Sequence, residues 1–144
     1  MTDKTLLLSI RPQYASKIFD GEKKVELRKV RPRHLSKGDE VFVYVSSPTK
    51  ELQGMFTVES ILEATPEELW HKVKNSAGIS KQEFDDYYSG STKGFGIFLK
   101  IPRTLANPIS LFDLRKIWEN FHPPQSYRYL TNHELGRISY NLIN

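Results

Sequence analysis

The segment from Gly21 to Arg28 carries the side chains best suited to chemistry in this chain. Its sequence GEKKVELR alternates charged and apolar residues from Lys24 onward, and Lys23 lies beside the preceding turn. Residues two apart in a strand point to the same face, so Glu26 and Arg28 lie side by side. Glu26 can accept N–H hydrogen bonds, Arg28 can bind a carbonyl or phosphate, and Lys23, if desolvated, can donate or release a proton. The set could anchor a polar ligand, or it could form an exposed strand face with cross-strand ion pairs.

Two further segments offer polar groups for ligand binding. Tyr44, Ser46 and Ser47 follow one another at the end of an apolar run, where hydroxyl groups can line the rim of a sheet or simply satisfy a turn. The segment PPQSYRY combines a stiff Pro-Pro pair with Tyr127, a ring on which a base could stack. The alternative is that this Tyr-rich segment packs the C-terminal tail onto the rest of the chain.

Basic residues gather between Lys23 and Lys37, with seven Lys or Arg against one acidic residue, whereas the whole chain has a net charge of +4. Such a cluster can bind a polyanion through the release of counterions. We expect the basic arm from Lys29 to Lys37, which includes Arg31 and Arg33, to follow a nucleic-acid backbone. The alternative is an ordinary solvated strand and loop.

Several classes of function are not expected. The chain has no cysteine, which excludes disulfides, thiolate metal sites and a cysteine nucleophile. The four histidines show no metal-ligand spacing, and P-loop, HExxH and GxSxG motifs are missing. We therefore expect no cofactor and no metal. No apolar run approaches the roughly 20 residues of a membrane-spanning helix, so we expect a cytoplasmic protein without a membrane partner.

The elements that must position these side chains follow from periodicity. Apolar runs predict strands at residues 5–10, 41–45, 54–62 and 94–101, and alternation predicts another from Val25. A helix follows Arg11-Pro12 and ends at Gly21, and Thr65 and Ser80 are each followed three residues later by Glu, as in a capping box. Helices are also expected at residues 109–118, capped by Ser110, and at residues 132–142.

The order of these elements predicts an α+β fold in a single domain spanning residues 1–144. Five or six short, mostly antiparallel strands favour a small, partly closed β-barrel with helices around it. We place the barrel at about residues 5–101. The prolines from Pro102 onward suggest a helical C-terminal extension over residues 102–144.

The chain resembles the ASCH domains of the PUA-like superfamily, and in particular a subgroup described as predicted transcriptional regulators. The resemblance runs from Leu6 to about Leu130 and includes the G-x-K-x-x-E-x-R element formed by Gly21, Lys23, Glu26 and Arg28. Its other elements, in order, are LSIRPQYASKIFD, GDEVFVYVSSPTKELQGMFTVESI, TPEELWHK, AGISKQEFDDYYSG, GFGIFLKI and PPQSYRYL. The resemblance implies a pseudo-barrel with a cleft lined by the Lys–Glu–Arg element, and PUA-like relatives bind RNA or read modified bases in DNA.

An enzyme branch of similar proteins removes an acetyl group from N4-acetylcytidine. Those enzymes use the lysine of the G-x-K element, a threonine three residues later and a downstream carboxylate. Here Lys23 is retained, but Glu26 stands at the threonine position, and the carboxylate position falls near Asn75 or Ser76. Glu26 would have to activate a water, with Lys23 as acid or electrostatic partner, which is a different mechanism.

The leading hypothesis is a module that binds RNA, or a modified nucleobase or nucleotide, with DNA as another partner to test. Lys23 and Arg28 would contact phosphate or carbonyl oxygens, and Glu26 would read an exocyclic amine. Tyr44, Ser46 and Ser47 would line the rim, and Tyr127 would stack. The enzyme alternatives are the acylcytidine hydrolase and a ribonuclease in which Glu26 is the base and Lys23 and Arg28 stabilise the phosphorane. A protein-interaction module is a third alternative, and no oligomeric state is predicted.

Overall fold

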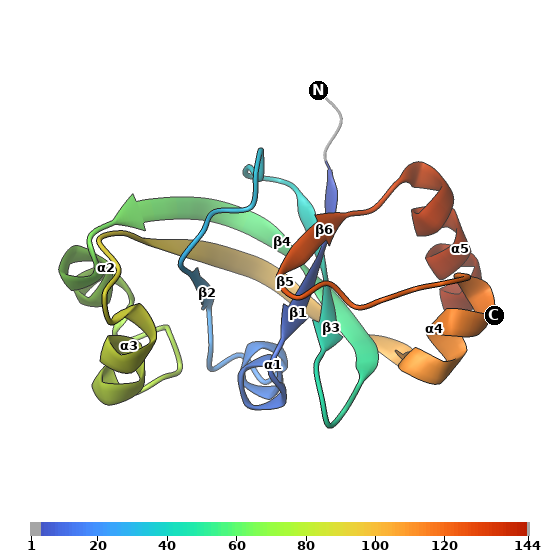
Figure 1. Ribbon diagram of the computed structural model, residues 1–144, viewed down its shortest axis with the longest axis horizontal. Coiled ribbons are helices and arrows are strands. Elements are labelled where there is room, and N and C mark those ends of the chain that lie inside the picture. The colour runs from blue at the N-terminus through green and yellow to red at the C-terminus, as the bar shows by residue number, and fades with distance from the viewer. Residues whose placement is uncertain (1–3, 144) are drawn as a thin grey trace.

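A six-stranded sheet in the order β2–β5–β4–β3–β1–β6 runs through a computed structural model that describes residues 4–143 (Figure 1). The strands are β1 (Thr5–Ile10), β2 (Val25–Arg28), β3 (Glu40–Val45), β4 (Glu51–Ala64), β5 (Gly94–Ser110) and β6 (Tyr127–Tyr129). The helices are α1 (Pro12–Phe19), α2 (Pro66–Val73), α3 (Lys81–Tyr88), α4 (Leu111–Ile117) and α5 (Asn132–Ile143). The described helices include none that is long and apolar enough to cross a membrane.

The centre of the sheet is formed by the apolar runs that the sequence shows. Leu6, Leu7 and Leu8 of β1 are at most 1% exposed, because both faces of this strand are covered. β1 pairs in parallel with β3, and the other described strand pairs are antiparallel. The predicted α+β fold with a mostly antiparallel, partly closed sheet is therefore confirmed.

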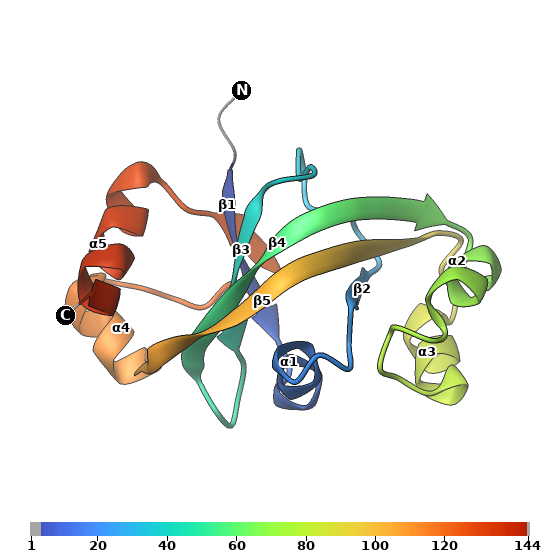
Figure 2. The same cartoon turned by 180° about the vertical axis from the view of Figure 1, so that it is seen from behind.

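The long strands β4 and β5 curve across the back of the molecule (Figure 2) and bend the sheet into a half-barrel. Their pairing shifts register at three places, and such irregularities bend a strand. At Gly54 a Cβ atom would lie 2.4 Å from the carbonyl oxygen of Arg103 and 2.7 Å from the ring of Phe19. Only glycine permits this close approach, which allows α1 to pack inside the curve.

The structure differs from the sequence-based expectation after residue 101. β5 continues through Pro102 and Pro108 to Ser110, so the sheet does not end where a helical extension was expected. Both prolines fall in register shifts between β4 and β5, where no ladder hydrogen bond has to be donated. The predicted helical extension also contains a strand, β6, which pairs with β1. The helices starting after Ser110 and at Asn132 are present as expected.

Three apolar clusters hold the helices on the sheet. One joins α1 to the inner face through residues such as Ala15 and Ile18. A second lies beneath α4 and α5 and includes Leu114 and Phe121, and a third lies beneath α2 and α3 and includes Leu69 and Phe84. The two helix pairs occupy opposite ends of the molecule, with α1 between them (Figures 1 and 2).

Candidate functional site

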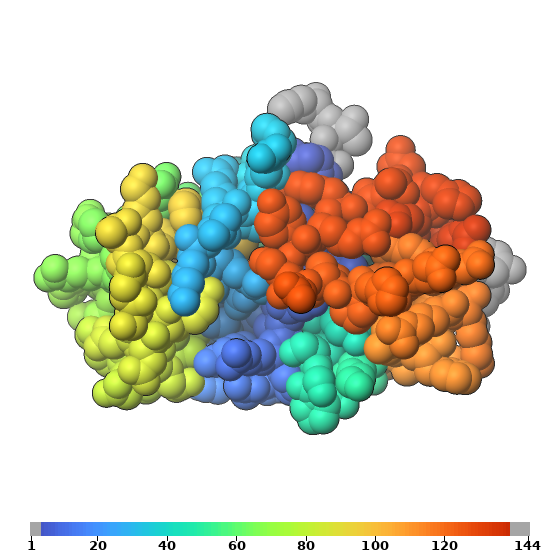
Figure 3. All heavy atoms as spheres, in the orientation of Figure 1, coloured from blue at the N-terminus to red at the C-terminus, as the bar shows by residue number. Residues whose placement is uncertain are grey.

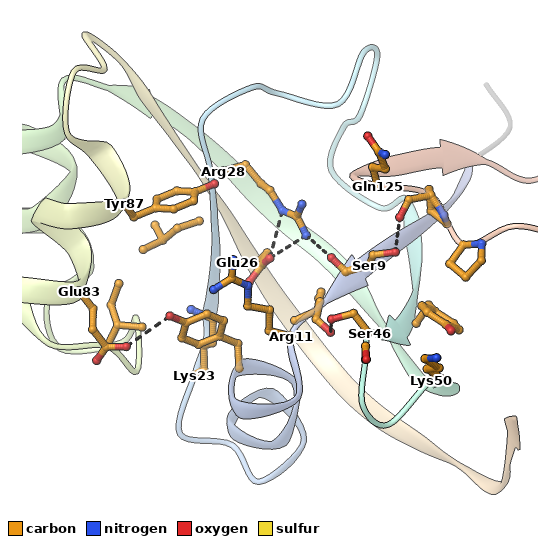
Figure 4. A pocket seen from close by; sticks show the side chains of 18 of the residues that line it. Ser9, Arg11, Lys23, Glu26, Arg28, Ser46, Lys50, Glu83, Tyr87 and Gln125 are labelled. Carbon is orange, nitrogen blue, oxygen red and sulfur yellow. Dashed lines mark hydrogen bonds and ion pairs between the residues drawn. The ribbon is translucent and has the colours of Figure 1, made fainter. Parts of the chain in front are cut away.

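A cavity of about 610 Å³ opens between α1, α3, the strand β2 and the segment that leads into β6. Figure 3 shows these segments meeting in the middle of one face of the molecule. The end of β1 and the β3–β4 hairpin complete the lining. Segments from all three thirds of the chain therefore build one hollow, and Figure 4 shows its polar side chains.

Glu26 and Arg28 form a fixed ion pair on the β2 wall of the cavity. The carboxylate oxygen Oε2 of Glu26 lies 2.9 Å from Nη2 and 3.1 Å from Nε of Arg28. Nη2 of Arg28 also donates to the carbonyl oxygen of Ser9 at 2.9 Å. Glu26 is only 6% exposed, so the alternative of an exposed charged strand face is wrong. Because Arg28 is held by two partners, it presents Glu26 to the cavity in one orientation (Figure 4).

Lys23 lies at the inner end of the cavity and is 2% exposed. Its Nζ donates to the carbonyl oxygen of Ala77 at 2.7 Å and lies 5.3 Å from the centre of the Tyr14 ring. Burial lowers the pKa of the Lys23 ammonium, and the negative charge of Glu26 opposes this effect. One N–H of this ammonium is engaged by Ala77, so further donors are available for a ligand.

The α2–α3 loop packs against Lys23 and also binds residues around it, Lys24 and Lys17, through backbone carbonyl groups. Ser76 accepts from the backbone N–H of Lys24 at 2.7 Å, and Gly78 accepts from Nζ of Lys17 at 2.7 Å. Gly78 has a φ of +66°, and a Cβ there would lie 3.1 Å from Cβ of Lys23. The loop therefore fits closely around the Lys23 side chain.

Helix α3 supplies the opposite wall through Glu83 and Tyr87. The hydroxyl of Tyr14 donates to the carboxylate of Glu83 at 3.3 Å, and burial together with that carboxylate raises the pKa of Tyr14. The Ser80 backbone N–H, which donates to Glu83 at the start of α3, keeps the pKa of Glu83 below its usual range. Burial raises the pKa of Tyr87, which keeps its ring neutral.

The β3–β4 hairpin forms the rim, where the structure places Tyr44, Ser46 and Ser47 as the sequence suggested. Tyr44 is 2% exposed, and its ring meets Phe121 edge to face at 6.3 Å between ring centres. Burial raises the pKa of Tyr44. Ser46 donates its backbone N–H to Ile10 at 2.9 Å, which ties the hairpin to β1. Lys50 lies exposed at the same rim.

Tyr127 does not lie where the sequence suggested. It is outside the cavity lining, and its hydroxyl accepts the backbone N–H of Arg33 at 3.1 Å. Tyr129 donates its hydroxyl to the carbonyl oxygen of Arg33 at 2.6 Å. The two tyrosines therefore fix the loop before β3, because β6 points them toward that loop rather than toward the cavity. The same segment still reaches the cavity through Gln125, and the hydroxyl of Ser9 donates to the carbonyl of Pro124.

The basic arm lies beside the cavity rather than in it. Lys29, Arg31 and Arg33 are exposed and do not contribute to the lining. Lys29 places its Nζ 4.9 Å from the centre of the Tyr87 ring, at the edge of the cavity, whereas Arg31 bonds the carbonyl of Leu35 within its own loop. The structure therefore extends positive charge outward from one side of the cavity.

Five charged or aromatic residues of the cavity lining were not singled out from the sequence as site residues, namely Arg11, Tyr14, Lys50, Glu83 and Tyr87. Glu83 was noticed only as part of the capping box that starts α3. Lys50 and Arg11 flank predicted elements, but nothing in their local spacing shows which way they point. The lining contains four basic and two acidic side chains, which favours an anionic ligand. Among residues 4–143, no three acidic or histidine side chains form a group that could hold a metal ion.

Comparisons with known proteins agree with this architecture. The family model of the ASCH domain matches residues 8–108. An ASCH domain-containing ribonuclease from Zymomonas mobilis is 30% identical over 142 residues, which is 96% of this chain and 95% of that protein. A crystal structure of ASCH from Zymomonas mobilis superimposes with a TM-score of 0.89 at 29% identity, covering 95% of this chain and 94% of that one.

A more distant structure shares the fold alone. Human THYN1 protein, solved in complex with DNA that contains 5-methylcytosine, has a TM-score of 0.61 at 13% identity and covers 99% of both chains. This likeness extends the fold to a protein solved with nucleic acid. The comparisons do not address the transcriptional-regulator subgroup, which stays a prediction.

Proposed function

We propose that this chain, which belongs to the ASCH domain family, binds single-stranded RNA in the central cavity and cleaves it there. The observation that carries the proposal is the convergence of Lys23, Glu26 and Arg28 on one cavity with an excess of basic residues. A volume of about 610 Å³ lies within the range of sites for small ligands. The full-length relative from Zymomonas mobilis supports RNA as the polymer and cleavage as the reaction.

Binding rests on complementary polar groups. Lys23 and Arg28 contact phosphate or carbonyl oxygens, as charged donors in a low-dielectric site. The second carboxylate oxygen of Glu26 accepts no hydrogen bond within the described residues, so it is available to the 2′-hydroxyl of the bound RNA. Tyr14 and Tyr87 offer ring surfaces on the α1 and α3 sides of the cavity.

Cleavage uses the 2′-hydroxyl of the RNA as the nucleophile. Glu26 takes the proton of this hydroxyl while the 2′-oxygen attacks the neighbouring phosphorus, and the bond from phosphorus to the 5′-oxygen breaks. Lys23 and Arg28 stabilise the negative charge that builds up on the phosphorane oxygens. The leaving 5′-oxygen takes up a proton, so the products carry a 2′,3′-cyclic phosphate and a 5′-hydroxyl.

The acylcytidine hydrolase gains no support from the arrangement. Asn75 and Ser76, where that mechanism would need a carboxylate, are not among the cavity-lining residues. The hydroxyl of Ser76 instead donates to the carbonyl of Val73 in the α2–α3 loop.

The test compares a single-stranded RNA oligonucleotide with the same sequence methylated at every 2′-hydroxyl. We expect both to bind and only the unmodified RNA to be cut, with cyclic phosphate ends detected by mass spectrometry. Binding without cleavage of either oligonucleotide would reduce the function to that of an RNA-binding module. An absence of binding to both would overturn the proposal.

Replacing the proposed base tests the assignment within the cavity. Glu26→Gln keeps the shape and one hydrogen bond to Arg28 but cannot accept the proton, so we expect kcat to fall by about 100-fold or more. Glu59→Gln, on an exposed carboxylate of β4 outside the cavity, is the matched control. Unchanged cleavage by a folded Glu26→Gln protein would remove Glu26 from the mechanism.

A further inference from the structure

A second hollow lies beside the mouth of the central cavity, against α4. Its volume is about 550 Å³, and its lining comes from the hairpin residue Lys50 and from α4 and its cap, namely Ser110, Leu111, Phe112, Arg115 and Lys116. Lys50 and Leu111 line both hollows, and the backbone N–H of Leu111 donates to the carbonyl of Lys50 at 2.9 Å. The two hollows are therefore neighbours that share one edge.

Phe112 is the aromatic side chain of this second hollow. It is 72% exposed on the first turn of α4, although phenylalanine is usually buried. The helix does not need this ring for its own stability, because Leu114 packs into the core and Ser110 caps the first turn. Nζ of Lys116 lies 4.4 Å from the centre of the Phe112 ring, and no other cation of the described residues contacts this ring.

The charges around Phe112 are mainly positive. The lining contains three cations, Lys50, Arg115 and Lys116, and no carboxylate. Two carboxylates lie close by: Asp113, whose oxygen is 3.4 Å from Nζ of Lys116, and Glu51, which pairs with Ser110 across β4 and β5. Nε of Arg115 donates to the carbonyl of Phe121 at 3.2 Å, which fixes the guanidinium beside the hollow. An exposed ring surrounded by cations is the arrangement that binds single-stranded nucleic acid, with a base on the ring and phosphates on the cations.

We propose that the α4 hollow is a second nucleotide site for the RNA strand that occupies the central cavity. The base of a neighbouring nucleotide stacks on Phe112, Lys50 contacts the phosphate between the two sites, and Arg115 and Lys116 contact the next phosphate. This inference rests on the proposed function, since it extends the same bound strand. Charge complementarity and the shared edge at Lys50 favour this occupant over a protein partner.

The experiment measures binding of two 2′-O-methylated RNA oligonucleotides, a trimer and an octamer, by fluorescence polarisation. Base stacking on an aromatic ring contributes ~1–3 kcal/mol, so we expect Phe112→Ala to weaken octamer binding by at least about fivefold and to leave trimer binding unchanged. Phe112→Tyr, which keeps a ring, restores the octamer affinity. Lys116→Ala weakens the octamer as well, whereas Lys72→Ala, an exposed lysine of α2 at the other end, does not.

The outcomes separate this inference from the proposed function. If the wild-type protein binds the octamer and Phe112→Ala binds it equally well, the second site is wrong while RNA binding stands. Equal weakening of trimer and octamer would also overturn it, because the ring would then act on the central cavity. If the wild-type protein binds neither oligonucleotide, both proposals fail. Loss of a protein partner by the Phe112 variants would then assign this surface to protein binding.

Discussion

Lys23 is a charged residue that the fold encloses almost completely, at 2% exposure. Its ammonium is buried beside Tyr14 and Ala77, and within the described residues no carboxylate lies within ion-pair distance of it. A buried cation without a carboxylate partner lowers the stability of the folded state. Lys23 therefore does not stabilise the fold. Its position in the central cavity favours a role in binding an anionic ligand.

Substitution of Lys23 by methionine tests how much the buried ammonium destabilises the fold, through the pH dependence of the free energy of unfolding. The pKa of Lys23 is lowered in the folded state, so the unfolded chain binds more protons between that lowered pKa and the ordinary value of 10.5. Wild-type stability therefore gains from rising pH in this window, whereas Lys23→Met lacks that gain. We expect the free energy of unfolding of the variant, relative to wild type, to decrease between pH 7 and pH 10 in urea titrations. Lys72→Met should show a constant difference, and a constant difference for Lys23→Met would contradict the burial effect.

Gly78 and Gly90 form a matched pair for testing how the α2–α3 loop positions Lys23. Both have positive φ, so alanine at either position costs about 1 kcal/mol of strain. A Cβ at Gly78 would also press on Lys23, whereas one at Gly90 meets no atom within 4 Å. We expect both variants to lose stability in urea titrations, and Gly78→Ala alone to weaken RNA binding. Equal RNA affinity of the two variants would show that the loop does not position Lys23.

At the scale of elements, α3 connects helix capping to the cavity. Ser80 accepts the backbone N–H of Glu83 at 3.1 Å, and the Glu83 carboxylate accepts the backbone N–H of Ser80 at 3.1 Å. The same carboxylate accepts the hydroxyl of Tyr14, which joins α3 to α1. One residue thus starts the helix and forms part of the cavity wall.

Two N-cap substitutions separate stability from function. Ser80→Ala and Thr65→Ala each remove a side-chain cap, at the start of α3 and α2, and each should cost about 1 kcal/mol of unfolding free energy. Only Ser80→Ala also loosens Glu83 and Tyr87 at the cavity, so it alone should raise the KM for RNA cleavage. Urea titrations and steady-state kinetics give the two readouts. A matching increase in KM for Thr65→Ala would mean that the effect follows stability alone.

At the scale of the whole molecule, positive charge continues outward from both sides of the cavity. Lys29 lies at the edge next to Tyr87, and Lys50 leads to Arg115 and Lys116 on the other side. The net charge of +4 is modest, so this placement matters more than the total. A single RNA strand could contact cations on both sides while one nucleotide occupies the cavity.

The salt dependence of RNA binding measures these contacts. For single strands the logarithm of the binding constant falls with that of the salt concentration, with a slope of about −0.7 per phosphate contact. We expect Lys29→Ala to make this slope shallower by about 0.7 and Lys72→Ala to leave it unchanged, in polarisation titrations between low and physiological salt. An identical slope for Lys29→Ala and wild type would place Lys29 outside the RNA path.

The amino-acid sequence by itself determined the local elements and the chemistry of one segment. Apolar runs predicted β1 and β3, and caps at Thr65, Ser80 and Ser110 predicted three helix starts, because these signals act between neighbours in the chain. The alternation in β2 placed Glu26 and Arg28 on one face. The prolines after residue 101 led to the wrong end of β5, since only its pairing with β4 shows that they fall in bulges.

Only the tertiary structure decided which side chains meet. Arg11, Tyr14, Lys50, Glu83 and Tyr87 come to one cavity because the curved sheet brings α1, α3 and the β3–β4 hairpin together. Tyr127 turns toward Arg33 because β6 pairs antiparallel with β1, a long-range register that no local pattern specifies. The burial of Lys23 and Glu26 is also decided by tertiary packing, because segments distant in the sequence enclose both side chains. Their spacing along the chain does not predict this burial.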